Sequence, residues 1–511
     1  MMILLNASAQ WEWTSNLPSE IVSTHEFFLS VKAPVNTGSV RLVSKKLKPR
    51  TFETLIKDTG VVEFPDPFSY GNDGSVHGYD NLEVYFEDEL VLERQVYIYP
   101  STLSIAGLYD NTGTYVTAAV ASSIFYMTVL NNDSTILPNT TLILAPFASN
   151  CSSVISAKST MDILSNSSYI AIHGPDCSES AAVDAVIAGA FEIPMISGTA
   201  SASKLSNKRA YPYFMRTTPT STLHAIALLN TVNFFKFKHI IAISTDQFPF
   251  SDDFYTLANR LNITIVANII LKTGEMDFSH QLDIISKTGV NVIISNVMDV
   301  AGRFDAKVLY EYGIKKGLFN EPYNWFLEFT PMLDFDYYVP KEYSQAVFYS
   351  MSSSMYLNMN RTDIAQHITD TWNSFNGDIS TIPYVNFDVG PNDIKDFWEK
   401  VHNKQIKMRQ VHSFQVDCLS TIARALHDIL YIKKIPLDGK TLYSAMRNQS
   451  FEGLTGKLIF DQNGDTQPPF YINVYNNVFD EYAGEVTWDP VSHIGNLSLS
   501  KIINRQYHTN A

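Results

Sequence analysis

Two runs of alternating apolar strands and amphipathic helices constrain the fold of this chain more than any other feature. The first run starts with the apolar strand LSIAGLYD at residues 103–110, followed by a helical stretch and the strand TLILAPF. It continues through YIAIHGP and IPMIS, with a helical segment between the strands. Strands that are apolar on both faces and alternate with helices are typical of a parallel α/β sheet covered on both sides.

The same pattern begins again after the segment FMRTTPT, with the strands HIIAIST, ITIVANII and VNVIISN separated by helical stretches. A second lobe of the same build is therefore predicted. Two such lobes bind ligands in the gap outside the carboxyl ends of their strands. We assign residues 101–218 and 343–465 to lobe 1, residues 219–342 and 466–490 to lobe 2, and residues 491–511 to a C-terminal tail.

The first hundred residues follow a different pattern. Short β-branched and aromatic segments such as FFLSVKA and LVLERQVYIY are separated by turn-rich pieces such as PDPFSYGNDGS. This spacing predicts a small antiparallel all-β domain over residues 1–100, with a sandwich as one arrangement. None of its residues indicates a chemistry.

Charge, cysteine content and hydropathy exclude several classes of protein. The formal net charge of -15 disfavours nucleic-acid binding, because a phosphate backbone is bound through clustered Lys and Arg. Three cysteines allow at most one disulfide and one free thiol. No run of about 18 apolar residues is present, so no membrane span is predicted. The opening MMILLNASAQ lacks the basic flank and long apolar run of a signal peptide, which leaves the route of export open.

Asn-X-Ser/Thr sequons are spread over the whole chain and avoid its apolar strands. Their distribution favours an extracellular location, either as a secreted protein or as the ectodomain of a membrane receptor. Chance matches in an Asn-rich sequence are the alternative. The sequons begin at Asn6, Asn132, Asn139, Asn150, Asn166, Asn262, Asn360, Asn448 and Asn496.

Common catalytic and metal-binding signatures are missing from the sequence. There is no G-x-G-x-x-G, G-x-x-x-x-G-K-[ST], H-E-x-x-H, C-x-x-C or G-x-S-x-G. The segment DQNGDT at Asp461 begins like a calcium-binding loop, but Thr466 replaces the glycine that such a loop needs, so we interpret it as a hairpin turn. The sequence favours a binding protein over an enzyme and predicts no cofactor and no metal.

Two small-residue turns follow strands of the first lobe. In GPDCS the Gly and Pro end a strand, and Ser178 is placed to cap the next helix, whose N-terminus suits a carboxylate. In GTASAS, which carries Ser201, small residues let the backbone approach a ligand. The alternatives are a cap that serves only its own helix and an ordinary surface loop.

Several stretches, in order, resemble the ligand-binding region of class C G-protein-coupled receptors, closest to the metabotropic GABA-B type. They include LSIAGLYD, GPDCS, PMISGTASASKLSN, YPYFMRTTPTSTLHA, NWFL and AMRNQSFEGLTGKLIFDQNGD, and together cover residues 103–489. The resemblance implies the two-lobed clamshell (Venus-flytrap) fold of periplasmic-binding-protein type I. The N-terminal β-domain lies outside it.

The resemblance also implies roles for individual residues. Ser178 and Ser201 match the two serines that hold the carboxylate of an amino-acid ligand. Trp325 matches the second-lobe tryptophan that closes over the ligand. Cys151 and Cys177 match the cysteines of a first-lobe disulfide.

This sequence departs from the family pattern on the side of the ligand amine. Met298 replaces an aromatic residue that contacts the ligand, and Val411 replaces the acid that meets the amine. Tyr115 matches a first-lobe aromatic residue. An unmatched buried ammonium is costly, so GABA is a doubtful ligand, and Glu328 or Asp299 could supply a replacement acid.

Three further positions are assigned from the alignment and from the local sequence. Asp176, beside the serine site, is interpreted as a structural residue. Asp417 matches a position at the start of a helix. Cys418 has no partner in the resemblance and is interpreted as a buried thiol.

The predicted function is that of an extracellular, cell-surface or secreted ligand-binding region of a receptor. Lobe closure on a small anionic or zwitterionic ligand would give the signal, because the second lobe touches the ligand only when shut. A homo- or heterodimer through lobe 1 is expected, whereas a membrane module and a G protein belong to this function only if the chain continues. The alternatives are a soluble secreted binding protein, a ligand-silent dimerisation subunit, and a hydrolase of doubly wound fold.

Overall fold

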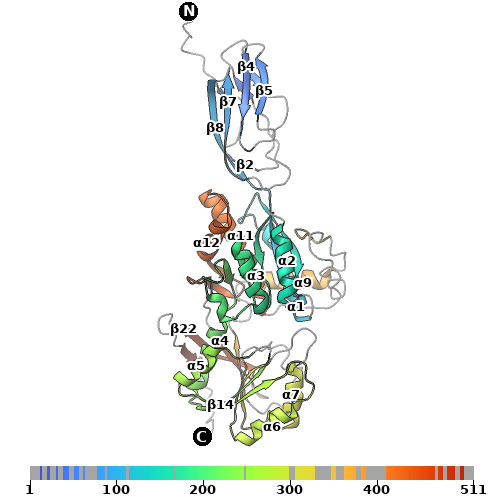
Figure 1. Ribbon diagram of the computed structural model, residues 1–511, viewed down its shortest axis with the longest axis vertical. Coiled ribbons are helices and arrows are strands. Elements are labelled where there is room, and N and C mark those ends of the chain that lie inside the picture. Colours follow the sequence, from blue (N-terminus) through green and yellow to red (C-terminus); the bar gives the residue numbers. More distant parts are fainter. Residues whose placement is uncertain are drawn as a thin grey trace, which may run out of the picture.

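The computed structural model consists of an N-terminal β-domain, a first α/β lobe and a second α/β lobe, arranged one after another along the long axis (Figure 1). The residues that the structure describes are 12–13, 20–22, 30–32, 38–44, 46, 51–56, 61–63, 77–86, 89–110, 114–165, 168–246, 249–297, 305–327, 347–352, 362–375, 381–386, 410–466, 470–475, 480–488 and 495–499.

The N-terminal domain consists of short, mostly antiparallel strands, as predicted, and they form two sheets. Apart from the parallel pair β2–β8, neighbouring strands within both sheets are antiparallel. The three-stranded sheet has the order β1 (Glu12–Trp13), β3 (Ser30–Lys32), β6 (Val61–Glu63). The five-stranded sheet has the order β2 (Glu20–Val22), β8 (Glu89–Tyr99), β7 (Gly78–Phe86), β4 (Gly38–Val43), β5 (Thr51–Ile56).

Lobe 1 is built on a five-stranded parallel sheet. Its strands are buried on both faces, and two apolar cores lie on opposite sides of the sheet. The strand order is β10 (Thr141–Ala148), β9 (Thr102–Tyr109), β11 (Tyr169–His173), β12 (Met195–Ser197), β13 (Phe214–Arg216). Around it lie α1 (Thr114–Asn132), α2 (Ser153–Ser165), α3 (Ser178–Ala190), α9 (Thr362–Ser374), α11 (Gln410–His427) and α12 (Gly439–Arg447) (Figure 1).

Lobe 2 repeats the parallel βα pattern and then extends it with antiparallel strands. The eight-stranded sheet has the order β15 (Thr264–Leu271), β14 (His239–Thr245), β16 (Val292–Asn296), β17 (Asn324–Leu327), β18 (Val347–Ser352), β21 (Phe470–Tyr475), β22 (Asp480–Trp488), β23 (Gly495–Leu499). Its helices are α4 (Ser221–Phe234), α5 (Asp252–Arg260), α6 (Ser279–Thr288) and α7 (Asp305–Lys315).

Two of the predicted boundaries of the lobes are wrong in position. Strand β18, which was predicted within lobe 1, pairs with β17 and β21 in the sheet of lobe 2. Strand β23, which was predicted in the C-terminal tail, pairs with β22 and extends the same sheet. A strand belongs to the sheet that satisfies its backbone hydrogen bonds, and the sequence pattern does not show which sheet that is.

Three structural features fix lobe 1 to its neighbours. The β-domain meets lobe 1 without a long linker, because β8 ends at Tyr99 and β9 begins at Thr102. The ring of Tyr99 stacks on that of Tyr431, with 4.3 Å between centroids, in the π-helical turn η4 (Asp428–Lys433) that follows α11. On the other side, the chain passes from β13 directly into α4 of lobe 2.

Candidate functional site

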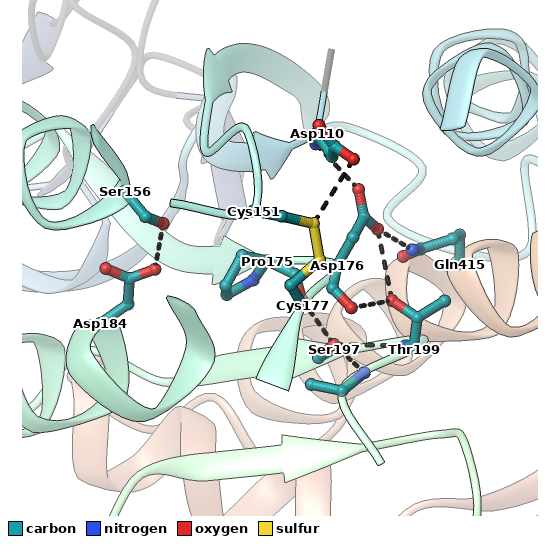
Figure 2. Close-up of a disulfide and its surroundings, with 11 residues drawn as sticks. Asp110, Cys151, Ser156, Pro175, Asp176, Cys177, Asp184, Ser197, Thr199 and Gln415 are labelled. Atoms are coloured by element: carbon teal, nitrogen blue, oxygen red, sulfur yellow. Dashed lines mark hydrogen bonds between the residues drawn. A yellow bond between two sulfur atoms is a disulfide. The ribbon is translucent and has the colours of Figure 1, made fainter. Parts of the chain in front are cut away.

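The polar turns of lobe 1 gather at the carboxyl edge of its parallel sheet. Asp110 follows β9, Asp176 lies between β11 and α3, and Thr199 follows β12 (Figure 2). In a parallel sheet the carboxyl ends of all strands meet at one edge, which is where open α/β folds bind ligands. The GPDCS and GTASAS turns, which follow β11 and β12, both lie at this edge.

A disulfide joins the turn after β10 to the turn between β11 and α3. Cys151 and Cys177 are bonded, with 5.3 Å between their Cα atoms, as the family resemblance implies. Asp110 lies beside the bridge, with its Oδ2 3.4 Å from Cys151 Sγ (Figure 2). These three residues are close enough to hold a metal, but disulfide sulfurs are not thiolates and do not serve as metal ligands. We therefore assign no metal to this site.

Helix α3 begins differently from its prediction. Its N-cap is Cys177 and not Ser178, and the Cys177 side chain makes no capping hydrogen bond. The Cys177 sulfur is bonded to Cys151 and accepts no hydrogen bond from the helix, so the N–H groups of the first turn have no side-chain cap. Such N–H groups, at the positive end of a helix dipole, are suited to an anion.

Ser178 uses its hydroxyl to hold the second serine turn in place. Its Oγ accepts a hydrogen bond of 3.1 Å from the backbone N–H of Ala202, which follows Ser201 directly. The carbonyl of Ser201 in turn accepts a hydrogen bond of 2.8 Å from the N–H of Ser221, the first residue of α4. The two serine turns are therefore neighbours, and they lie against the first helix of lobe 2.

Asp176 connects the turn after β9, the turn after β12 and helix α11 through hydrogen bonds. Its carboxylate accepts hydrogen bonds from the Asp110 N–H, at 3.0 Å, and from Gln415 Nε2, at 2.6 Å (Figure 2). Thr199 Oγ1 donates to the backbone carbonyl of Asp176 at 2.7 Å. Burial raises the pKa of the Asp176 carboxyl to about 7, although the hydrogen bond from the Asp110 backbone opposes the shift. These contacts agree with the structural role predicted for Asp176.

A buried histidine lies under the same network. Tyr109 Oη and His173 Nδ1 are 2.8 Å apart, and both residues are fully buried. Burial lowers the pKa of His173 to about 4, so the imidazole is neutral at pH 7. A neutral ring beside a neutral phenol adds no charge to this edge of the sheet.

Trp325 occupies a different place from the one its predicted role requires. It is fully buried in lobe 2, and its indole N–H donates to the Leu318 carbonyl at 2.9 Å. Its ring packs against Phe319 with 5.0 Å between centroids. With no exposed surface and its donor satisfied, the indole in this structure is a core side chain, which argues against a ligand-closing role.

Two neighbouring residues of α11, Asp417 and Cys418, have well-defined surroundings. Asp417 lies in the middle of the helix and not at its start, and its carboxylate accepts from the backbone N–H groups of Leu454 and Thr455 at 2.7 and 2.9 Å. Cys418 is a free, buried thiol, as expected, and burial raises its pKa. Asp417 thus fixes the turn between β19 (Ser450–Gly453) and β20 (Gly456–Ile459).

The residues predicted on the amine side of the ligand lie outside what the structure describes. Met298, Asp299 and Glu328 fall in segments that are not described. Tyr115 and Val411 lie in α1 and α11, but their side chains are not among the described ones. Their roles remain predictions.

Sequence reasoning missed Gln415 and Arg216, two buried residues that organise the serine turns. Gln415 reaches Asp176, and the guanidinium of Arg216 donates to the carbonyls of Ala200 and Ala202 at 3.0 and 2.9 Å. A signal for Arg216 exists in the sequence, since it is a single charge at the end of the apolar strand FMR. Burial of such a charge requires a partner elsewhere in the chain.

Comparison with known proteins places the chain in a receptor family. The family described as receptor family ligand binding region matches residues 124–477. This match covers well over half of the chain, so the protein belongs to that family. The resemblance to the ligand-binding region of class C receptors is confirmed.

Several curated receptors match parts of the chain. Gamma-aminobutyric acid type B receptor subunit 1 of Mus musculus is 23% identical over 356 residues, which is 66% of this chain and 35% of the receptor. Metabotropic glutamate receptor-like protein E of Dictyostelium discoideum is 23% identical over 57% of this chain and 33% of its own length. Taste receptor type 1 member 2 of Rattus norvegicus is 27% identical over 30% of this chain and 19% of its own length. The chain therefore covers about a third or less of these relatives.

No helix in the described part of the chain has the length and apolar character needed to cross a bilayer.

Proposed function

We propose that this chain is the extracellular ligand-binding region of a receptor and holds a small carboxylate-bearing, amino-acid-like ligand between its lobes. The observation that carries the proposal is the start of α3. Its N-cap is a disulfide-bonded cysteine that leaves the first turn uncapped, and the Ser178 hydroxyl beside it also holds the turn of Ser201. Uncapped N–H groups and two hydroxyls are the donors that a carboxylate requires.

The position of this site supports closure of the lobes around the ligand. The Ser201 carbonyl accepts from the N–H of Ser221, so the turn meets the first residue of lobe 2. Ser203 Oγ is also 2.9 Å from Ser221 Oγ. A ligand at this edge would touch lobe 2 only in the closed state, and its extra affinity for that state would shift the equilibrium. For the ligand amine we retain Glu328 or Asp299 as partners, and we keep Met298 and Tyr115 as further ligand contacts.

Ligand binding can be tested by thermal-shift titration with 4-aminobutyrate, L-glutamate, glycine, succinate and the corresponding amides. Stabilisation depends on ligand concentration relative to the dissociation constant. The variants Ser178→Ala and Ser201→Ala are each expected to weaken binding of a carboxylate hit about tenfold, since a hydrogen bond to a charged group contributes about 1.5–3 kcal/mol. Ser165→Ala, an exposed serine on α2, is the matched control.

Four results would contradict this assignment. Equal affinity of the serine variants and the wild type for a carboxylate would place the site elsewhere. No stabilisation by any compound would favour the ligand-silent dimerisation subunit, and turnover of a compound would favour an enzyme. Equal binding of acid and amide would exclude the carboxylate as the recognised group.

A dimer through lobe 1 is part of the proposed function. Helices α2 and α3 expose the large apolar side chains Val154 (80%), Met161 (51%) and Val186 (52%), and Phe191, directly after α3, is 57% exposed. Apolar surface of this kind is typical of protein interfaces. We expect Phe191→Asp to lower the dimer fraction in sedimentation velocity, whereas Phe234→Asp in lobe 2, which replaces a side chain that is 47% exposed, leaves it unchanged.

An extracellular location agrees with the disulfide, because such bonds persist in oxidising compartments. Among the described sequons, Asn132, Asn139, Asn262 and Asn448 are exposed and accessible to glycosylation. The amide oxygen of Asn150 is buried, so this sequon is a poorer acceptor. Asn6, Asn166 and Asn360 lie outside the described residues, and the Asn496 side chain is not described.

A further inference from the structure

Arg216, at the end of β13, carries a fully buried charge that is paired within the protein. Its Nε donates to Asp465 Oδ1 at 2.6 Å, and the two side chains are 0% and 5% exposed. A buried ion pair contributes little net stability over apolar replacements, because desolvation of both charges offsets their attraction. Stability alone is therefore a weak explanation for this pair.

The other donors of the guanidinium hold the loop of Ser201, which we call the serine loop (residues 198–206). One nitrogen, Nη1, donates to the carbonyls of Ala200 and Ala202, which flank Ser201 on both sides. The other, Nη2, donates to Ser206 Oγ at 2.6 Å. The planar guanidinium thus fixes both ends of the segment that carries Ser201.

The same residue also lies where the chain crosses between the lobes. Its backbone N–H donates to the Gly464 carbonyl at 3.0 Å, and residues 216 and 465 form a parallel bridge. One residue further on, Thr466 Oγ1 donates to the Thr217 carbonyl at 2.7 Å. Two crossings, from β13 to α4 and from β20 to β21, are therefore bonded to each other at Arg216 and Asp465.

We propose that Arg216 is a positioning residue that couples the serine loop to the inter-lobe crossings. One side chain connects Ser201 to the segments that must bend when the lobes close, so the position of Ser201 depends on the Arg216–Asp465 pair. This inference rests on the proposed function for its effect on ligand affinity. Its effect on the loop does not depend on any ligand.

The test uses the double variant Arg216→Met with Asp465→Leu, which removes both buried charges together and avoids leaving either one unpaired. Amide hydrogen exchange is followed in peptides that cover the serine loop and in peptides from β9 and β11. Three loop amides have hydrogen bonds that report on it: Ala200 N–H to Ser197 Oγ, Ala202 N–H to Ser178 Oγ, and Leu205 N–H to the Ala202 carbonyl.

We expect exchange in the serine loop to accelerate about tenfold or more, while β9 and β11 keep their protection. Affinity for 4-aminobutyrate or L-glutamate, whichever stabilises the wild type, is expected to fall about tenfold, as for loss of a charged hydrogen bond. The control is Ser156→Ala with Asp184→Asn, which removes a buried hydrogen-bonded pair between α2 and α3 away from the loop. The control is expected to lower stability without changing loop exchange or affinity.

A second variant decides the question if the double variant does not fold. Arg216→Lys keeps the charge opposite Asp465 but replaces the planar fork with a single ammonium. It is expected to retain the fold and to show faster exchange in the serine loop.

Native loop exchange and native affinity in a folded variant would overturn the positioning role. Faster loop exchange in a protein that none of the four acids stabilises would support the positioning role while rejecting the proposed function.

Discussion

The two lobes share one build but differ at the carboxyl edges of their sheets. In lobe 2 the described parallel strands alternate between two apolar cores. At their carboxyl ends, β14 and β16 carry small buried polar side chains: Ser244, Thr245, Ser295 and Asn296. At the carboxyl edge of the lobe 1 sheet lie the Cys151–Cys177 disulfide, the Asp176 carboxyl with its raised pKa and the buried Arg216–Asp465 ion pair.

This difference bears on where the proposed ligand site is organised. Buried polar groups cost stability unless each is hydrogen-bonded. A fully hydrogen-bonded cluster of them therefore holds the surrounding turns in one arrangement. In the proposed function, lobe 1 therefore carries the prearranged ligand site, whereas the described carboxyl edge of lobe 2 has buried polar side chains but no disulfide and no buried ion pair. The predictions that follow test this contrast, starting from the largest expected effect.

The first prediction concerns Trp325 as a core residue of lobe 2. Trp325→Ala removes a fully buried ring and leaves the Leu318 carbonyl without its donor, so the free energy of unfolding should fall by about 3–5 kcal/mol. Chemical denaturation measures this change. The contrast between the lobes would fail if the variant kept its stability and lost only ligand affinity, since Trp325 would then be a ligand residue.

The second prediction concerns the stabilisation of lobe 1 by its disulfide. Replacing Cys151 and Cys177 by serine opens a loop with a sequence separation of 26, which should cost about 3 kcal/mol of unfolding free energy. Hydrogen exchange with and without a reductant measures the effect on each lobe. We expect lost protection near α2, α3 and the serine turns and unchanged protection in β14 and β16; an equal loss in both lobes would contradict the contrast.

The third prediction concerns the pH dependence that Asp176 gives to lobe 1. Its folded-state pKa is raised to about 7, above the ordinary value of 3.8, so the folded protein holds more protons than the unfolded chain between these values. Stability from this group is therefore greatest in acid and falls as the pH rises to about 7. Asp176→Asn removes this dependence, so the melting temperature of the variant relative to wild type should rise between pH 5 and pH 8.

The expected size of this change is about 1 kcal/mol, or a few degrees, after allowance for the partial exposure of the residue. Burial lowers the pKa of His173 to about 4, so the contribution of this residue to stability grows as the pH rises from about 4. The wild type and Asp176→Asn share this contribution, which therefore cancels when their melting temperatures are compared. Asp162→Asn, at an exposed carboxylate on α2, serves as the control. A constant difference between Asp176→Asn and wild type at all pH values would contradict the raised pKa.

Much of the fold could be predicted from the sequence, because periodicity is a local property. The strand LSIAGLYD and the helices after it were located by apolar pattern alone, and they form β9 and its neighbours. The start of α3 is not located by the sequence, which predicts Ser178 as the cap; the folded chain has Cys177 at that position instead. The family resemblance supplied the disulfide, which spacing alone left open.

The sequence by itself determined that the chain forms two α/β lobes, carries a formal net charge of -15 and places serine-rich turns after strands of the first lobe. Tertiary structure alone decided that β18 and β23 join lobe 2, that Trp325 is a core residue and that Arg216 holds the serine loop. The reason is physical: hydrophobic periodicity is written into neighbouring residues, whereas hydrogen bonds and charge pairs are satisfied by partners far along the chain. Arg216 and Asp465 are 249 positions apart, and no local pattern connects them.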